Sequence, residues 1–204
     1  MGRMMQNGFT ERFQAHYPKV KRLQDIVVSS VLLILLSPLL LLVALAVALT
    51  SKGSVIFWSA RTGYKGETFL MPKFRTMTQN SKVMQREIAT SNDICVTKIG
   101  HLLRKSSLDE LPQLWSVLKG EMSLIGPRPL LVNDQVIAQR GKFTEIFDVK
   151  PGITGLAQVN GRNFISMRNK VRYDAFYANR MCMLLDLRIA FRTVGAVMNT
   201  KLVK

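Results

Sequence analysis

Two adjacent carboxylates, Asp109 and Glu110, are the residues of this sequence best suited to chemistry. They lie in the stretch Lys105-Ser-Ser-Leu-Asp-Glu-Leu-Pro112, in a chain that has 29 Lys and Arg residues against 13 Asp and Glu residues. We expect Asp109 to be the N-cap of a helix with Pro112 in its first turn, where a missing N–H costs little. The positive end of the helix dipole would then favour the ionised carboxylate, which could serve as a nucleophile or a metal ligand.

A purely structural role is the alternative for this pair. Ser107 and Glu110 have the spacing of a capping box, in which Glu110 would only bond the backbone. That frame places Pro112 at the fifth helical position, where proline removes a hydrogen bond and clashes with the preceding turn. We therefore favour Asp109 as the cap, which leaves the side chain of Glu110 free. Residue types alone do not decide between catalysis and capping.

The composition limits the kinds of protein this chain can be. A length of 204 residues predicts one domain with appendages. A net charge of +16 suits nucleic acid, anionic lipid headgroups or phosphorylated substrates as partners. The two cysteines and two histidines form no metal-binding or disulfide pattern, which indicates a reducing compartment.

The segment Ile26–Leu49 is apolar and has no charged residue. As a straight helix it would reach ~36 Å, enough to cross a bilayer. A signal peptide, a spanning helix and a re-entrant helical hairpin that enters and leaves the same face are the three interpretations. The segment is longer than the roughly 7–15 apolar residues of a signal peptide, which argues against the first.

Two features of this segment bear on the other two interpretations. Pro38 lies near its middle, where it favours a bend, and the hydroxyl of Ser37 can bond a backbone carbonyl freed there. Residues 1–25 and residues 51–75 each contain five Lys and Arg residues. The positive-inside rule therefore gives no asymmetry, as expected if both flanks lie on the cytoplasmic face. These features leave the re-entrant and spanning interpretations about equally supported.

The remaining segments predict elements that flank this apolar segment and the carboxylate pair. Phe9, Phe13 and Tyr17 are spaced by four, which is typical of an interfacial amphipathic helix ending at Pro18, with a disordered tail as the alternative. The range 54–77 predicts two strands around a turn at Gly63–Gly66, whose second strand carries Lys73 and Arg75 as candidate phosphate ligands or as a solvated edge. The range 99–119 predicts a helix broken near Ser106–Leu108.

The C-terminal third adds one rigid arginine and two turn-rich segments. Arg128 lies between Pro127 and Pro129, which limits its backbone freedom and suits bidentate phosphate contact. The range 149–163 predicts a hairpin turn, or alternatively a wall of a sugar or nucleobase pocket. The range 184–197 predicts an amphipathic helix that packs on the core or lies in a membrane interface.

Together these segments resemble one family closely, the bacterial sugar transferases that are small monotopic polyprenyl-phosphate phosphoglycosyl transferases. The resemblance extends from Lys21 to about Leu187 and departs from the family in the roughly twenty residues before it. It is carried by Lys21–Asp25, Ser37-Pro38, Lys73-Phe-Arg-Thr-Met77, Leu103–Gln113, Leu118–Pro129, Lys150–Asn163 and Tyr173-Asp174.

The resemblance implies transfer of a sugar-1-phosphate from a UDP-sugar to polyprenyl (undecaprenyl) phosphate, the first membrane step of surface glycan assembly. In such an enzyme Asp109 is the nucleophile that forms a covalent phospho-sugar intermediate, and Glu110, with Asp109, is associated with Mg²⁺. The resemblance assigns phosphate binding to Lys73, Arg104 and Arg128, and substrate binding more loosely to Arg162, Asn163 and Asp174. It also favours the re-entrant interpretation, with the break at Ser37 and Pro38.

The expected architecture is a helix-dominated α/β fold. It has a basic amphipathic extension at residues 1–25, a re-entrant membrane helix at residues 26–50, and a catalytic domain at residues 51–204 on the cytoplasmic face. Interfacial amphipathic helices and a small β-hairpin belong to it. The expected location is the bacterial inner membrane, and the expected partners are a UDP-sugar, polyprenyl phosphate and membrane lipid, with no nucleic acid. A homo-oligomer and downstream glycosyltransferases are further partners that the sequence leaves open.

Overall fold

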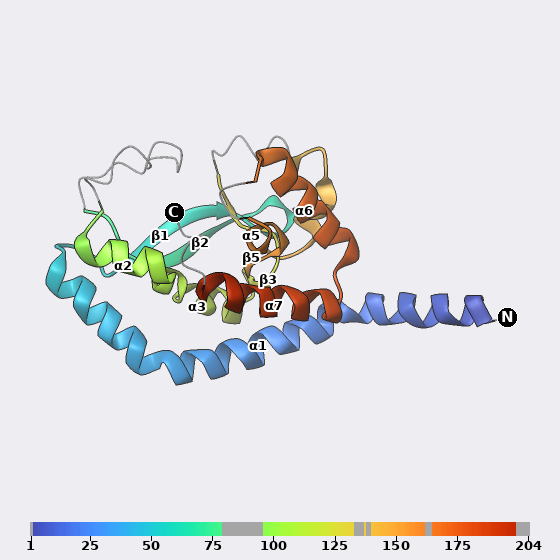
Figure 1. The fold of residues 1–204 in the computed structure, drawn as a ribbon, viewed down its shortest axis with the longest axis horizontal. Coiled ribbons are helices and arrows are strands. Elements are labelled where there is room, and N and C mark those ends of the chain that lie inside the picture. The colour runs from blue at the N-terminus through green and yellow to red at the C-terminus, as the bar shows by residue number, and fades with distance from the viewer. Residues whose placement is uncertain (1, 79–95, 133–136, 138–139, 162–164, 199–204) are drawn as a thin grey trace.

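A computed structural model describes residues 2–78, 96–132, 137, 140–161 and 165–198 of the chain (Figure 1). The fold is α/β with helices dominant, as the sequence predicts. The helices are α1 (Gly2–Thr50), α2 (Lys98–Ser106), α3 (Gln113–Lys119), α5 (Leu156–Val159), α6 (Met167–Arg180) and α7 (Met183–Met198), with 3₁₀ turns η1 (Tyr64–Gly66), η4 (Leu108–Glu110) and η5 (Thr144–Asp148). The strands are β1 (Ile56–Thr62), β2 (Thr68–Phe74), β3 (Ser123–Ile125), β4 (Leu130–Leu131) and β5 (Gly152–Thr154).

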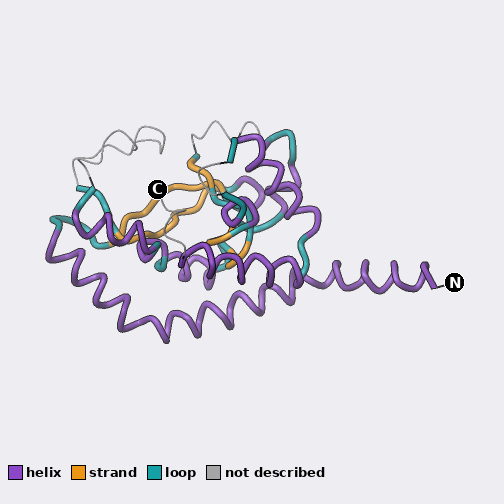
Figure 2. The backbone as a smooth tube through the Cα atoms, in the orientation of Figure 1, coloured by secondary structure: helices purple, strands orange, loops and turns teal. Residues whose placement is uncertain are grey.

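Helix α1 is the longest element and runs along one side of the molecule (Figure 1). It changes direction in the part that contains the apolar segment, as the tube trace also shows (Figure 2). Pro38 lies inside the helix and cannot donate to the carbonyl of Ile34, and Ser37 Oγ donates to that carbonyl at 2.8 Å. The helix therefore bends at this point instead of breaking, because the hydroxyl replaces the lost backbone bond.

The expected end of a separate N-terminal helix at Pro18 is wrong, because α1 continues through Pro18. Tyr17 does not belong to an exposed interfacial face either. Its side chain is buried and its hydroxyl donates to Asp186 of α7 at 2.7 Å. Asp186 therefore holds Tyr17 against the globular body. The four-residue spacing of the aromatic residues carries no information about this distant contact.

The apolar half of α1 is buried near its two ends, at Ser29 and again at Val43 and Val47. Val43 and Val47 are buried in a cluster with Phe74 of β2 and Leu103 of α2. Most of the remaining apolar side chains of this half are exposed, among them Ile34, Leu35, Leu41, Leu42, Leu45 and Leu49. Within the described residues, one helical segment, Tyr17–Thr50, is long and apolar enough to cross a membrane. An apolar surface of this extent indicates a covering partner or lipid.

The predicted hairpin is confirmed, with η1 between β1 and β2. The register pairs Phe57 with Lys73 and Arg61 with Phe69, and β4 adds to the other edge of β1. Because side chains alternate along a strand, Arg61 of β1 and Lys73 of β2 lie on one face of this sheet. The hairpin thus presents two cations on the same side.

The second sheet corrects the prediction of a hairpin turn in the range 149–163. Strand β5 pairs in parallel with β3, which lies far away in the sequence, through Ser123 with Gly152 and Ile125 with Thr154. A Cβ atom on Gly152 would come within 2.1 Å of the backbone nitrogen of Gly126, so glycine permits this close approach. This pairing places the loop after β3 beside β5 and α5.

Polar contacts fix the first half of α1 to this body. The carboxylate of Asp25 accepts from the hydroxyl of Ser123 and the backbone N–H of Leu124. Arg22 donates to the carbonyls of Val117 and Leu118 at the end of α3, at 2.6 and 2.7 Å. A cation at a helix C-terminus is a favourable cap, and here it couples α1 to the helix that follows the carboxylate pair.

Candidate active site

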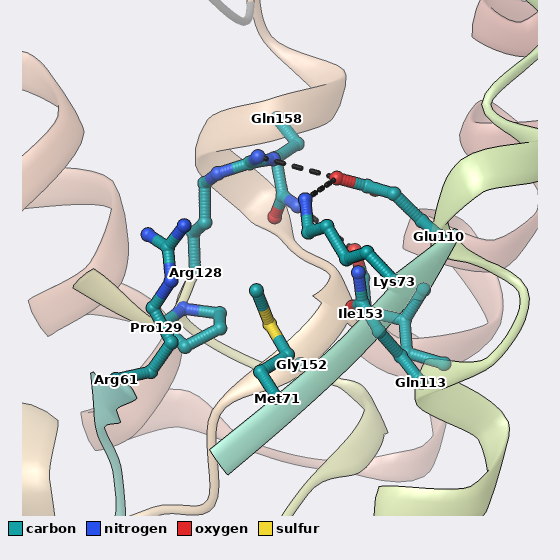
Figure 3. A pocket seen from close by; sticks show the side chains of 10 residues that line it. All are labelled: Arg61, Met71, Lys73, Glu110, Gln113, Arg128, Pro129, Gly152, Ile153 and Gln158. Carbon is teal, nitrogen blue, oxygen red and sulfur yellow. Dashed lines mark hydrogen bonds and ion pairs between the residues drawn. The ribbon is translucent and has the colours of Figure 1, made fainter. Parts of the chain in front are cut away.

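A small open hollow of about 210 Å³ lies where both sheets, η4, α3 and α5 meet (Figure 3). Cationic side chains and an open mouth suit the hollow to the phosphate groups of a ligand better than to an apolar one. Its described lining contains three cations and a single carboxylate. The lining residues are Arg61, Met71, Lys73, Glu110, Gln113, Arg128, Pro129, Gly152, Ile153 and Gln158.

Glu110 connects the two cations that come from opposite walls of the hollow. Its Oε1 atom accepts from Lys73 Nζ at 2.7 Å and from Arg128 Nη2 at 3.3 Å (Figure 3). Burial lowers the pKa of Lys73, and the charge of Glu110 opposes that change. The expectation that the side chain of Glu110 is free is therefore wrong, because it is the centre of an ion-pair cluster.

Asp109 precedes Glu110 in η4, is half-buried, and does not line the described hollow. Burial and, next, the charge of Glu110 raise its pKa to about 6, while Lys73 and Arg104 act to lower it. The carboxyl group thus lies within electrostatic range of two cations. A carboxyl with such a pKa is mostly ionised at neutral pH, the form that a nucleophile needs.

Neither predicted capping arrangement is present at this pair. Helix α2 ends at Ser106, and the next residue, Ser107, has a left-handed backbone with φ of 58° and makes no side-chain cap to η4. The chain then restarts as η4, and α3 begins only after Pro112, which occupies the N-cap position without a capping side chain. Asp109 therefore lies inside a 3₁₀ turn ahead of α3. The predicted break near residues 106–108 is confirmed.

The other predicted phosphate and substrate ligands lie in different places. Arg104 is exposed on α2, bonds Thr76 Oγ1 through Nε at 3.0 Å, and does not line the described hollow. Arg75 is buried and donates to the backbone and hydroxyl oxygens of Ser51, which makes it part of the framework. Arg162 and Asn163 lie outside the described residues, so their predicted role stays a prediction.

Asp174 does not line the described hollow. It is buried on α6 and forms an ion pair with Arg140, which also donates to the backbone carbonyl of Arg128 at 3.0 Å. Burial raises the pKa of Asp174, and the charge of Arg140 opposes that change. Asp174 is thus linked to the loop of Arg128 through Arg140, and nothing in its position brings it to the hollow directly.

Sequence reasoning missed four of the polar residues around this site. Arg61 could have been found, because strand alternation in the predicted hairpin places it on the same face as Lys73. Gln113 and Gln158 carry no such signal, since a lone amide in a helix has no pattern of its own. Arg140 is linked to Arg128 only through tertiary contacts.

The Mg²⁺ that the family resemblance implies would need oxygen ligands at this site. No group of three or more His, Cys, Asp or Glu side chains that could hold a metal occurs among the described residues. Mg²⁺ commonly binds through one or two carboxylates together with substrate phosphates, and the adjacent Asp109 and Glu110 supply such a pair. Gln158, which lines the hollow together with Glu110, has a buried Oε1 atom without a hydrogen-bond partner, the kind of oxygen that Mg²⁺ accepts as a ligand. The residues therefore fit a Mg²⁺ ion shared between protein and substrate.

Comparison with known proteins agrees with the family resemblance noted in the sequence. The family model described as bacterial sugar transferase matches residues 16–200. A UDP-glucose:undecaprenyl-phosphate glucose-1-phosphate transferase of Klebsiella pneumoniae is 48% identical over 184 residues, covering 85% of this chain and 39% of the relative. The exopolysaccharide production protein ExoY of Sinorhizobium fredii is 39% identical over 192 residues, covering 87% of this chain and 84% of the relative. The chain thus spans about two fifths of the first relative and most of the second.

Proposed function

The chain belongs to the bacterial sugar transferase family, and on that premise we propose that it is a phosphoglycosyl transferase. It would move a sugar-1-phosphate from a UDP-sugar to undecaprenyl (polyprenyl) phosphate and release UMP, as the first membrane step of surface glycan assembly. The names of the relatives from Klebsiella pneumoniae and Escherichia coli, both glucose-1-phosphate transferases, support this reaction.

The observation that carries the proposal is the cluster at Glu110 with Asp109 beside it. Three cations around one carboxylate give the described hollow an excess of positive charge, which suits a diphosphate. Phosphoryl transfer depends mainly on positioning and charge neutralisation, and Arg61, Lys73 and Arg128 can supply both. Arg104 would act from the other side, near Asp109.

We propose two chemical steps on Asp109. In the first, a carboxylate oxygen attacks the sugar-bearing phosphorus, the bond from that phosphorus to the bridging oxygen breaks, and UMP leaves with the electron pair. In the second, a phosphate oxygen of the polyprenyl phosphate attacks the same phosphorus and the aspartyl ester bond breaks, which regenerates the carboxylate. Mg²⁺ held by Asp109 and Glu110 would neutralise the diphosphate charge when bound.

We further propose that the apolar half of α1 is re-entrant, so that the body lies on the cytoplasmic face of the inner membrane. The bend, the bond from Ser37 to Ile34 and the exposed apolar side chains support this topology. A topology of this kind lets the lipid tail of the acceptor stay in the bilayer while its phosphate meets the hollow. Single cysteines at Met5 and Lys52, in a chain without its two native cysteines, test it. Labelling of both only from the cytoplasmic side is expected, and periplasmic labelling of position 5 would refute the hairpin.

The reaction is tested with the purified chain, a panel of UDP-sugars and a short polyprenyl phosphate. We expect Mg²⁺-dependent UMP release with at least one sugar, and a loss of ~10⁴-fold or more in Asp109→Asn. Without acceptor, mass spectrometry should find a phospho-sugar adduct on the peptide that contains Asp109. Asp148→Asn, an exposed aspartate on η5, is the matched control and should keep full activity. Full activity in Asp109→Asn would remove the covalent step.

A further inference from the structure

Two backbone–backbone hydrogen bonds and one bond from a side chain fix the loop Gly126–Pro129, which carries Arg128 into the hollow. Gly126 N donates to Thr154 O at 2.9 Å, and Pro127 O accepts from Gly152 N at 2.9 Å. Both of these bonds tie the start of the loop to β5. The carbonyl of Arg128 itself is bonded at 3.0 Å by Arg140 Nη2, which is therefore the described anchor closest to the functional side chain.

Arg140 is itself held by a carboxylate. Its Nη2 atom donates at once to the Arg128 carbonyl and to Oδ2 of Asp174 on α6. The side chains of Arg140 and Asp174 are only 6% and 4% exposed. A buried charge pair of this kind is often no more stabilising than apolar side chains of the same volume, so stability alone is a weak reason for its presence.

We infer that Arg140, held in place by Asp174, is a positioning residue that sets the guanidinium of Arg128 against Glu110 and the bound diphosphate. The inference rests on the proposed function. Pro127 and Pro129 restrict rotation of the backbone around Arg128, so the loop behaves as a stiff arm. A shift of the Arg128 carbonyl therefore moves the Cα from which the guanidinium extends, and a misplacement of about 1 Å in an active site can cost ~10²-fold in rate.

A positioning role and a packing role of the Arg140–Asp174 pair predict different results when both side chains are replaced. If the pair only fills space, two apolar side chains of similar volume should replace it without loss of activity. If the pair positions Arg128, the same replacement leaves the Arg128 carbonyl without its donor, so the defect persists in a folded protein.

The test uses the full chain with the double variant Arg140→Met/Asp174→Leu, alone and combined with Arg128→Met. We expect a melting temperature close to that of the unchanged protein and a loss of ~10-fold or more in kcat/KM for the UDP-sugar. We also expect Arg128→Met to lower kcat/KM far less in the double variant than in the unchanged chain. A misplaced arginine already contributes little to kcat/KM, so its removal changes little. Arg172→Met, an exposed arginine on the same helix α6, is the control and should change neither quantity.

Asp174→Asn serves if the double variant does not fold, because an amide keeps the shape and one acceptor oxygen. The same reduced effect of Arg128→Met is expected there, to a smaller degree. Unchanged kcat/KM together with an undiminished Arg128→Met effect, in whichever variant folds, overturns the inference. Pyrophosphate affinity, measured by calorimetry with the same variants, gives a second readout. If the unchanged chain releases UMP from no UDP-sugar, the proposed function fails, whereas the pyrophosphate measurement still decides the positioning role.

Discussion

Two ion-pair clusters on either side of the Arg128 loop differ in their exposure to water. In the cluster at the hollow, the side chains of Lys73, Glu110 and Arg128 are 16%, 23% and 33% exposed. In the cluster behind the loop, those of Arg140 and Asp174 are 6% and 4% exposed. Water and ligands can therefore reach the first cluster, while the second is enclosed by protein.

The difference shows how one protein uses the same chemical pair for two purposes. A partly exposed cluster can exchange partners, so a phosphate can take the place of Glu110 on Lys73 or Arg128 at modest cost. A fully enclosed pair cannot exchange, because each charge would be left without compensation. The first arrangement suits binding and the second suits a framework. Substitutions in the two clusters should therefore separate activity from stability.

Removal of one partner from the enclosed pair should have the largest effect on stability. Asp174→Leu leaves Arg140 charged and buried without its carboxylate, which should lower the free energy of unfolding by ~3–5 kcal/mol. The measurement is thermal or denaturant unfolding in a mild detergent. Addition of Arg140→Met should recover most of the loss, because the unpaired charge is then gone. A stability of the single variant equal to that of the unchanged chain would contradict the enclosed character of the pair.

Removal of one cation from the exposed cluster should lower activity strongly and stability only slightly. Lys73→Met should lower kcat/KM for the UDP-sugar by ~10²–10³-fold, the usual cost of one lost electrostatic contact to a reacting group. Stability should change by no more than ~1 kcal/mol, since Arg128 still compensates Glu110. UMP release and unfolding, measured on the same sample, check both statements. Lys65→Met, exposed in η1 of the same hairpin, is the control, and a parallel loss of stability and activity in Lys73→Met would count against the comparison.

Much of the fold is local enough to follow from the sequence. The apolar half of α1, the β1–β2 hairpin and the break before η4 each depend on neighbouring residues, such as Pro38 with Ser37 or the glycines of the turn. The resemblance to a family pointed to Lys73, Glu110 and Arg128, which the structure brings to one hollow. Their individual roles stay predictions.

The contacts that could not be predicted are those between distant segments. The parallel pairing of β3 with β5 has no local signal, so the turn-rich sequence of the range 149–163 by itself predicts a hairpin. The role of Asp174 depends on Arg140, which lies 34 positions earlier in the chain. The capping prediction for Asp109 is wrong because Ser107, directly after α2, has a left-handed backbone and is followed by a 3₁₀ turn. Serine seldom adopts a left-handed backbone, so the sequence does not predict this arrangement.

The titration of Asp109 sharpens the comparison, because it reports on the charges around the exposed cluster. Its pKa of about 6 means that the carboxyl is protonated below that pH and ionised above it. Arg104→Met removes a cation that lowers the pKa, so the midpoint should move above 6. Glu110→Gln removes an anion that raises the pKa, so the midpoint should move down. Carboxyl ¹³C shifts of metal-free protein labelled at aspartate measure both, with Asp109→Asn identifying the signal, and a shift in the opposite direction for either variant would contradict the electrostatic assignment.

A third ion pair lies at the surface, and its removal should change stability and activity least. Lys119 and Glu121 lie 2.5 Å apart, but the lysine side chain is 49% exposed, so water and salt screen the attraction. Lys119→Met should change the free energy of unfolding by only ~0–1 kcal/mol and leave kcat/KM unchanged. Unfolding at low and high salt measures this, and the small difference should shrink further as salt rises. A loss of unfolding free energy as large as that of Asp174→Leu would mean that solvent exposure does not predict how much these ion pairs stabilise the protein. The two clusters would then differ only in their distance from the hollow.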